Sequence, residues 1–230
     1  MTVYGINPVR EALRGPRAVE RVWATEKVAR AQWLRGAPVT VAQPAEIAER
    51  CGSPDHQGMC AQVEPYRYAD ASVLLAGEAP LIVALDEVTD PQNLGAIART
   101  AEVAGATGLV ILERRAAEVT PAVAKASAGA VEHLPVARVR NLADFLAEAK
   151  AAGSWCYGAD AGAQVPYDAP DYSGGVVLVL GAEGRGLRPR VASACDQMVA
   201  IPQRGRIDSL NVSAAAAVLL YGILQGRSRS

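Results

Sequence analysis

Cysteine and histidine are scarce in this chain of 230 residues, which has four cysteines and two histidines. The cysteines are widely spaced and form no Cys-x-x-Cys pair: Cys51, Cys60, Cys156 and Cys195. This spacing argues against a zinc site or a thiol redox motif. With only His56 and His133, a histidine-based metal site or a Ser-His-Asp triad has little support. We therefore expect no bound metal, and reduced cysteines with ordinary structural roles.

Long hydrophobic runs are absent as well. The longest apolar stretch, residues 214–220, is far shorter than the roughly 18 residues that indicate a membrane-spanning helix. The N-terminus shows no signal-peptide pattern. Half of the residues are hydrophobic and 20% are charged, which supports a sizeable core and argues against a disordered chain. We expect a soluble, cytoplasmic protein without membrane contact.

The net charge is only −1, so the composition as a whole does not indicate nucleic-acid binding. The charges are nevertheless unevenly distributed. Residues 1–35 contain seven arginines or lysines against three glutamates, and residues 204–230 contain four arginines against one aspartate. Local basic patches of this kind suit contacts with RNA phosphates, although solvated surface charge explains the same counts equally well.

Residues 1–64 alternate short helical and strand-like patterns, which predicts a small α/β unit. Helices are predicted over residues 7–13, 27–34 and 45–51, and strands over residues 19–24, 39–41 and 59–63. A unit of this size is within the range that folds alone. Residues 65–79 contain Pro65 and Gly77 and show little periodicity, so we interpret them as a linker with a short helix near residues 72–75.

Residues 80–230 show a regular alternation of apolar strands and helices. Strands are predicted over residues 81–85, 109–112, 134–139, 155–159, 176–180 and 198–201. Helices are predicted over residues 93–104, 121–128, 142–152, 189–195 and 211–225. This alternation predicts an α/β domain with a mostly parallel sheet and helices on both faces. The last helix is apolar nearly all round, so it must be enclosed by its own domain or by a second subunit.

Three polar or glycine-rich segments follow predicted strands, at the ends where open α/β sheets bind ligands. In the first segment Asp90 and Pro91 break the strand, Asn93 lies near the start of the helix, and Arg99 follows six residues later. A helix N-terminus favours anionic groups such as phosphate. An ordinary Asn cap and a surface arginine explain the same pattern about equally well.

The second segment, residues 181–186, directly follows an apolar strand and contains Glu183. Its Gly-x-x-Gly-x-Gly order differs from the Gly-x-Gly-x-x-Gly of dinucleotide folds, and no Lys-Ser/Thr pair follows as in a P-loop. Glycine has no side chain, so backbone groups of this turn can approach a ligand closely. An acidic side chain in such a turn needs a partner.

The third segment begins at Ile201 and Pro202 and continues to the start of the last helix at Ser209, Leu210 and Asn211. Serine and asparagine are ordinary helix caps, and capping alone would explain one of them. Together the segments predict a compact pocket of exposed N–H and C=O groups. Such a pocket suits a nucleoside cofactor better than a metal ion or an acyl intermediate.

In their order and spacing the three segments resemble the motifs of the SpoU/TrmH family of RNA 2′-O-ribose methyltransferases, in the SPOUT superfamily. The resemblance covers residues 81 to about 225. The N-terminal unit adds the stretch 4–9 (Tyr-Gly-Ile-Asn-Pro-Val) and the tripeptide 56–58 (His-Gln-Gly). Both look like the ribosomal-protein-like RNA-binding domain of bacterial 23S rRNA guanosine methyltransferases, the members to which the whole chain is most similar.

The resemblance implies a domain order and a fold. Residues 1–64 would form the RNA-substrate-binding domain, residues 65–79 the linker, and residues 80–230 the methyltransferase domain with a deep trefoil knot. It further implies a homodimer formed through the knot helices, with 23S rRNA as the substrate.

The resemblance also implies a cofactor and site residues. S-adenosylmethionine would be held, without a metal, around Leu180, Gly181, Ile201 and Leu210. The family's catalytic positions correspond to Asn93, Arg99, Glu183, Ser209 and Asn211.

The role of Arg99 has two interpretations. In the family the matching arginine is proposed to remove the proton of the ribose hydroxyl, but a charged guanidinium has no acceptor site. Alternatively it stabilises the developing alkoxide as a cation, which we favour. Other substrates also stay open: a tRNA guanosine or the rRNA target of an antibiotic-resistance methyltransferase. A non-catalytic ribosome-assembly RNA binder is the alternative from another class.

Overall fold

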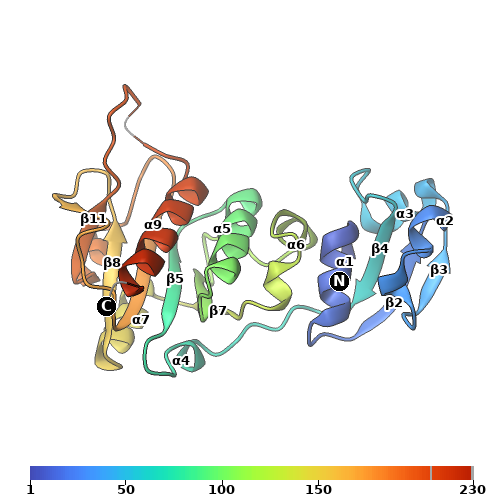
Figure 1. The fold of residues 1–230 in the computed structure, drawn as a ribbon, viewed down its shortest axis with the longest axis horizontal. Coiled ribbons are helices and arrows are strands. Elements are labelled where there is room, and N and C mark those ends of the chain that lie inside the picture. The colour runs from blue at the N-terminus through green and yellow to red at the C-terminus, as the bar shows by residue number, and fades with distance from the viewer. Residues whose placement is uncertain (208, 229–230) are drawn as a thin grey trace.

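The computed structural model describes residues 1–207 and 209–228, which form two α/β units, each built on its own sheet (Figure 1). Asp208 and Arg229, part of the C-terminal basic stretch, lie outside the described residues. No helix within the described ranges is long and apolar enough to cross a bilayer.

The N-terminal unit has a four-stranded sheet in the order β1-β4-β2-β3. Its strands are β1 (Thr2–Tyr4), β2 (Val19–Ala24), β3 (Val39–Val41) and β4 (Met59–Val63). Its helices are α1 (Ile6–Arg14), α2 (Glu26–Ala29), the 3₁₀ turn η1 (Gln32–Leu34) and α3 (Pro44–Cys51). The single helix predicted over residues 27–34 is wrong, because Ala31 has extended backbone angles that separate α2 from η1. Strand β1 was not predicted.

The second unit has a seven-stranded sheet in the order β7-β6-β5-β10-β8-β11-β9. Every pairing in it is parallel, as predicted. The strands are β5 (Leu81–Asp86), β6 (Gly108–Leu112), β7 (Val136–Val139), β8 (Ser154–Ala159), β9 (Val165–Pro166), β10 (Gly175–Gly181) and β11 (Gln197–Ala200). Strand β7 begins later than predicted because Pro135 has no N–H to donate to the ladder. The two-residue strand β9 was not predicted.

Helices cover both faces of this sheet, and alternate residues of each strand point to opposite faces. On β5, Leu81 and Val83 pack on one face, whereas Ile82 and Ala84 pack on the other. The first face is covered by α5 (Pro91–Val103), α6 (Pro121–Ala126) and α9 (Val212–Arg227). The other is covered by α4 (Ala71–Leu74), α7 (Leu142–Ala151) and α8 (Pro189–Ala194). These strands are buried on both faces, which explains their continuous apolar runs.

The strand order places two distant segments side by side. Strand β10 lies between β5 and β8, and its register sets Gly181 opposite Asp86. The glycine-rich turn after β10 therefore lies at the same edge of the sheet as the loop that leads into α5. The trefoil knot stays a prediction.

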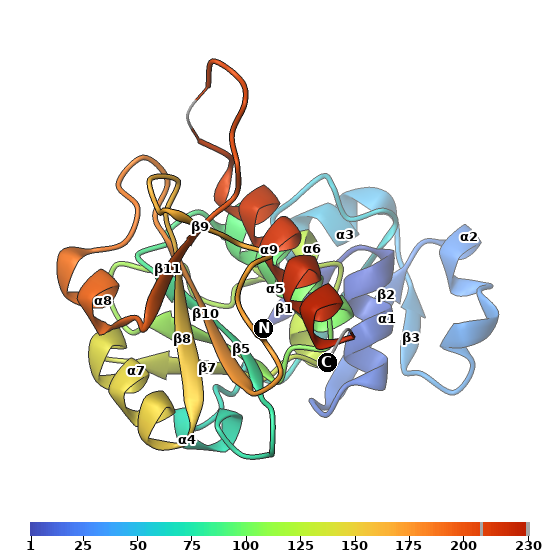
Figure 2. The same ribbon diagram turned by 60° about the vertical axis from the view of Figure 1, so that its left-hand side comes forward.

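Helix α9 is enclosed on one side only. Leu219, Leu220 and Ile223 are buried against α5 and the sheet, and Figure 2 shows α9 beside α5. Gly222 allows Tyr167 to pack closely against α9, because a Cβ on Gly222 would lie 2.6 Å from the Tyr167 ring. The opposite side of the helix is exposed in this single chain: Ala214, Val218, Tyr221 and Gln225.

The two units are in contact through α1, α6 and the 3₁₀ turn η2 (Ala130–Glu132). Arg17 and Glu132 form a buried ion pair across this contact, and the Arg17 guanidinium also donates to the carbonyl of Glu64 at 2.8 Å. Lys125 of α6 donates to the carbonyl oxygen of Asp55 at 2.9 Å. The segment predicted as a linker also packs on the second unit, through a bridge between Ala69 and Ala137.

The tripeptide 56–58 has a local structural role. Gln57 accepts a hydrogen bond from the backbone N–H of Ile6 at 3.0 Å, which satisfies a free donor at the start of α1. His56 is buried and its Nδ1 accepts from the N–H of Gly58 at 2.9 Å. These contacts tie the start of α1 to the start of β4.

Candidate active site

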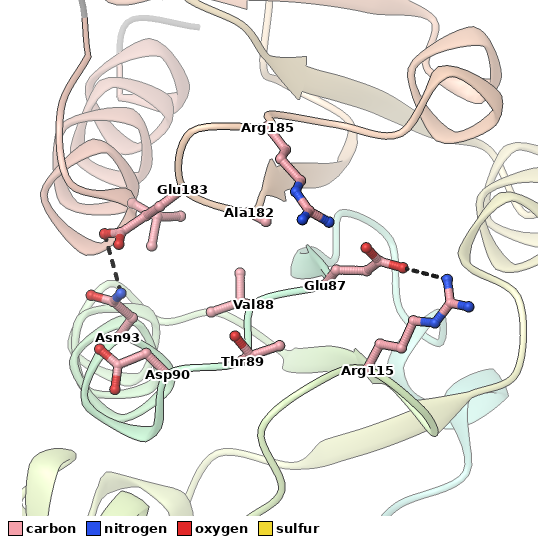
Figure 3. A pocket seen from close by; sticks show the side chains of 10 residues that line it. Glu87, Val88, Thr89, Asp90, Asn93, Arg115, Ala182, Glu183 and Arg185 are labelled. Carbon is pink, nitrogen blue, oxygen red and sulfur yellow. Dashed lines mark hydrogen bonds and ion pairs between the residues drawn. The ribbon is translucent and has the colours of Figure 1, made fainter.

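Three predicted site residues from three distant segments meet in one hydrogen-bonded cluster. The Asn93 side-chain amide donates to Glu183 Oε1 at 3.2 Å (Figure 3). The Asn211 amide donates to Asn93 Oδ1 at 3.0 Å and also to Glu183 Oε1. Glu183 thereby receives the partner that an acid in a glycine turn requires. We refer to Asn93, Glu183 and Asn211 as the Asn-Glu-Asn cluster.

Helix starts position both asparagines. Asp90 caps α5 by accepting from the N–H of Gln92 at 3.0 Å, and Pro91 occupies the first helical turn, which orients Asn93. Asn211 caps α9, because its Oδ1 accepts from the N–H of Ser213 at 2.9 Å. Asn211 therefore caps α9 through its side-chain oxygen, as one interpretation of the sequence had it. Its side-chain nitrogen takes part in the cluster.

The turn that carries Glu183 depends on glycine. A Cβ on Gly181 would lie 2.1 Å from the carbonyl carbon of Gly186, so no larger residue fits without moving the backbone. Gly184 and Gly186 have φ values of +74° and +66°, which L-residues rarely adopt. The N–H of Gly186 donates to the carbonyl of Ala182 at 2.9 Å and closes the turn.

An ion pair between a buried carboxylate and a half-exposed guanidinium anchors this turn to the neighbouring strand. The carboxylate of Asp86, 1% exposed, accepts from the N–H of Arg188 at 2.9 Å and from its Nε at 2.8 Å. This hydrogen bond raises the pKa of the Arg188 guanidinium. This pair was not predicted, although a carboxylate that ends an apolar strand indicates that a partner exists.

The first cavity, about 440 Å³, opens between the glycine turn and the start of α9. All four residues predicted to hold a cofactor line it: Leu180, Gly181, Ile201 and Leu210. Ser209 and Glu183 also line it, and Val199 and Leu219 add apolar surface. The volume is within the usual range for a small-molecule site.

A second cavity, about 390 Å³, adjoins the first (Figure 3). Four residues line both cavities: Ala182, Glu183, Arg185 and Val212. The remaining lining comes from the end of β5, the start of α5 and the loop after β6: Glu87, Val88, Thr89, Asp90, Asn93 and Arg115. The sequence analysis did not predict this cavity, since its walls come from separate loops.

Arg99 lies apart from the cluster. It is exposed on α5, lines neither cavity, and forms no hydrogen bond or ion pair with any residue in the described ranges. Six residues of helix separate it from Asn93, which turns its side chain to a different face of α5. Its exposed neighbour on that face is Val103, which is 64% exposed.

Within residues 1–207 and 209–228, no three His, Cys, Asp or Glu side chains are grouped so that they could hold a metal ion. Burial raises the pKa of the Cys156 and Cys195 thiols to about 12 and that of Cys60 to about 11. All four cysteines are free.

Family models match both units of the chain. The SpoU rRNA Methylase family matches residues 80–221. A second family, described as RNA 2′-O ribose methyltransferase substrate binding, matches residues 2–69.

Known proteins are similar over nearly the whole chain. YacO of Bacillus subtilis, named for the TrmH family of tRNA/rRNA methyltransferases, is 39% identical to this chain. The alignment is 238 positions long, gaps included, and covers 98% of this chain and 96% of YacO. The AdoMet-bound rRNA methyltransferase of Sinorhizobium meliloti has a TM-score of 0.82 at 30% identity, covering 97% of this chain and 86% of that one. The TrmH/SpoU tRNA modifying enzyme of A. aeolicus has a TM-score of 0.60 at 28% identity, covering 69% of this chain and 81% of that one.

Proposed function

Because this chain belongs to the SpoU/TrmH family of RNA methyltransferases, we propose that it methylates a ribose 2′-oxygen of a guanosine in 23S rRNA, with S-adenosylmethionine as the methyl donor. The observation that carries the proposal is the Asn-Glu-Asn cluster. Its members come from three segments that are far apart in the sequence; Glu183 lines both cavities, and Asn93 lines the second.

The first cavity suits a nucleoside cofactor. The missing Cβ of Gly181 lets backbone groups border the cavity, and Leu180, Ile201 and Leu210 offer apolar contact for an adenine ring. When bound, S-adenosylmethionine supplies a methyl group on a positively charged sulfur. No metal is required for this chemistry.

The cluster would act by positioning groups. Glu183 fixes both asparagine side chains, and Ser209 lies at the rim of the cavity, so the cluster and Ser209 together can orient a ribose hydroxyl. Alignment of reacting groups can lower a barrier by about 7–11 kcal/mol. A pure RNA binder would not need these side chains to converge, which favours an enzyme over a ribosome-assembly factor.

The exposed surface of α5 and α9 supports a homodimer. We define the α5–α9 face by its exposed side chains: Gln92, Arg99, Val103, Ala214, Val218, Tyr221 and Gln225. Val218 and Tyr221 are 37% and 47% exposed in the single chain. A second copy on this face would cover its apolar side chains. Arg99 of each subunit would serve the cavities of the other, where its cation would stabilise the developing alkoxide while phosphate or water takes up the hydroxyl proton.

Complementation between two inactive variants tests this arrangement. Arg99→Ala and Asn93→Ala would each be inactive alone. A refolded equal mixture would regain about a quarter of wild-type activity, because each mixed two-fold dimer keeps one complete site. If the mixture stays inactive while sedimentation shows mixed dimers, Arg99 does not act across the subunits.

The N-terminal unit favours ribosomal RNA as the substrate. The S. meliloti rRNA enzyme aligns with 97% of this chain, whereas the A. aeolicus tRNA enzyme aligns with 69%. The part that the shorter alignment leaves out is about as long as the N-terminal unit with its linker. We expect the reaction to take place in the cytoplasm, where ribosomal RNA is available, and the methyltransferase domain to contain the trefoil knot.

A labelling assay tests the proposed function. The protein is incubated with S-adenosylmethionine carrying a labelled methyl group and, separately, with 23S rRNA, 16S rRNA and tRNA. We expect label in 23S rRNA at one ribose-methylated guanosine, and none with an Asn93→Ala variant. Label in tRNA alone would contradict the proposed 23S rRNA substrate. The absence of label from all three RNAs would contradict the proposed methyltransferase activity.

A further inference from the structure

The second cavity presents opposite charges on facing walls. Arg185 extends into it from the glycine turn, and Glu87 extends into it from the end of β5 (Figure 3). Arg185 has no hydrogen-bond or ion-pair partner among the described residues, so its five N–H donors are available to a ligand. The cavity therefore offers hydrogen-bond donors on one side and a carboxylate on the other.

The Glu87 carboxylate is only partly satisfied. Arg115 and Arg188 lie 3.5 and 3.6 Å from it, and both face the same oxygen, Oε1. Oε2 has no partner in the part of the chain that the structure describes. The Glu87 side chain is 16% exposed and lines the second cavity.

Two of the four non-glycine residues with positive φ in the described ranges line this cavity. Glu87 and Arg115 have φ values of +58° and +60°, which non-glycine residues rarely adopt. The two residues contact each other, and both line the second cavity. Strained backbone of this kind costs of order 1–3 kcal/mol per residue and persists where function depends on the orientation of a side chain.

We propose that the second cavity is the pocket for the target guanine base, with Glu87 accepting from its N1–H and N2–H₂ edge and Arg185 donating to O6 and N7. This inference rests on the proposed function. Guanine alone among the common bases carries two adjacent donors on one edge and two adjacent acceptors on another. Arginine is the usual bidentate partner of O6 and N7. Adenine would place an acceptor against Glu87, and a pyrimidine has no N7 to accept from Arg185.

The position of the wall shared by the two cavities supports this assignment. Ala182, Glu183, Arg185 and Val212 form the wall that the first cavity shares with the second. A nucleotide whose base lies between Glu87 and Arg185 would have its ribose beside the Asn-Glu-Asn cluster. The ribose 2′-oxygen would then face S-adenosylmethionine, the methyl donor, across that shared wall.

Substrates with one altered base test the inference. Fragments of 23S rRNA are prepared with guanosine or inosine at the methylated position, since inosine lacks only the 2-amino group. Wild-type kcat/KM is expected to fall roughly 5- to 150-fold on inosine, the usual value of a good base contact. In Glu87→Gln the guanosine rate should fall by a similar factor, and the ratio of guanosine to inosine rates should approach one.

A second variant and a control separate the possible outcomes. Arg185→Met changes an exposed loop residue, and it should lose the wild-type preference for guanosine over 7-deazaguanosine, which lacks N7. Asp144→Asn removes an exposed ion pair with Arg190, neither of which lines a cavity, and should leave every ratio unchanged. Cofactor binding, measured by calorimetry, should stay at the wild-type level in Glu87→Gln and Asp144→Asn, whose residues do not line the first cavity.

Two results would overturn the pocket while leaving the proposed function intact. One is a wild-type enzyme that methylates guanosine and inosine substrates equally. The other is a Glu87→Gln or Arg185→Met variant that keeps the wild-type discrimination. If the wild-type enzyme methylates no guanosine substrate, the proposed function itself fails.

Discussion

The buried ion pair between Arg17 and Glu132 should dominate the stability of the contact between the two units. Their side chains are only 6% and 1% exposed, and the Arg17 Nε donates to Glu132 Oε2 at 2.9 Å. In Glu132→Leu the guanidinium of Arg17 would stay buried with only the Glu64 carbonyl as a hydrogen-bond partner. Removing one partner of a buried pair typically costs about 3–5 kcal/mol.

We expect this loss in the free energy of unfolding of Glu132→Leu, measured by urea denaturation. In a chain of this size each kcal/mol lowers Tm by roughly 2–4 °C, so the Tm should fall by about 6–20 °C. The double variant Arg17→Met with Glu132→Leu should recover most of the loss, because well-packed apolar residues can replace a buried ion pair at little cost.

Glu26→Leu is the matched control, since Glu26 pairs with Arg30 and both side chains are 76% exposed. An exposed pair contributes at most about 1 kcal/mol. The reasoning is wrong if Glu132→Leu loses no more stability than Glu26→Leu, or if the double variant is as unstable as the Glu132→Leu single variant.

Three further predictions concern the site and the thiols. Arg99→Lys should abolish methylation with little change in cofactor affinity, because lysine lacks the planar guanidinium fork; near-normal turnover would contradict this role. Gly181→Ala should weaken S-adenosylmethionine binding at least tenfold by calorimetry, since the added Cβ would collide with the backbone of the glycine turn. Gly174→Ala is the control and should bind normally, because no atom lies within 4 Å of the Cβ added there. Burial raises the pKa of Cys156 to about 12, so the native thiol stays protonated at pH values where an unfolded thiol, with a pKa near 8.5, ionises. The free energy of unfolding should therefore decline as the pH rises above about 8.5, and Cys156→Ala should make that decline shallower.

Local patterns in the sequence were sufficient for most of the element types. The apolar runs of β5 and β10 predicted buried parallel strands, and the alternation with helices predicted the layers. These predictions succeed because strand period and helix caps are encoded by residues close together in the chain. The family resemblance gave Asn93, Glu183 and Asn211 as site residues; they form one cluster in the structure, and their catalytic role stays a prediction.

Only the tertiary structure decided which of these elements meet. The insertion of β10 between β5 and β8, the Asp86–Arg188 anchor and the Arg17–Glu132 pair join residues about a hundred positions apart. Pairing over such separations leaves no period or local motif in the sequence. The second cavity likewise exists only where three loops converge, and the exposed position of Arg99 follows from how α5 packs on the sheet. The amino-acid sequence by itself determined the helices, the strands and the chemistry of their side chains. Long-range packing determined which of those side chains line the same cavity.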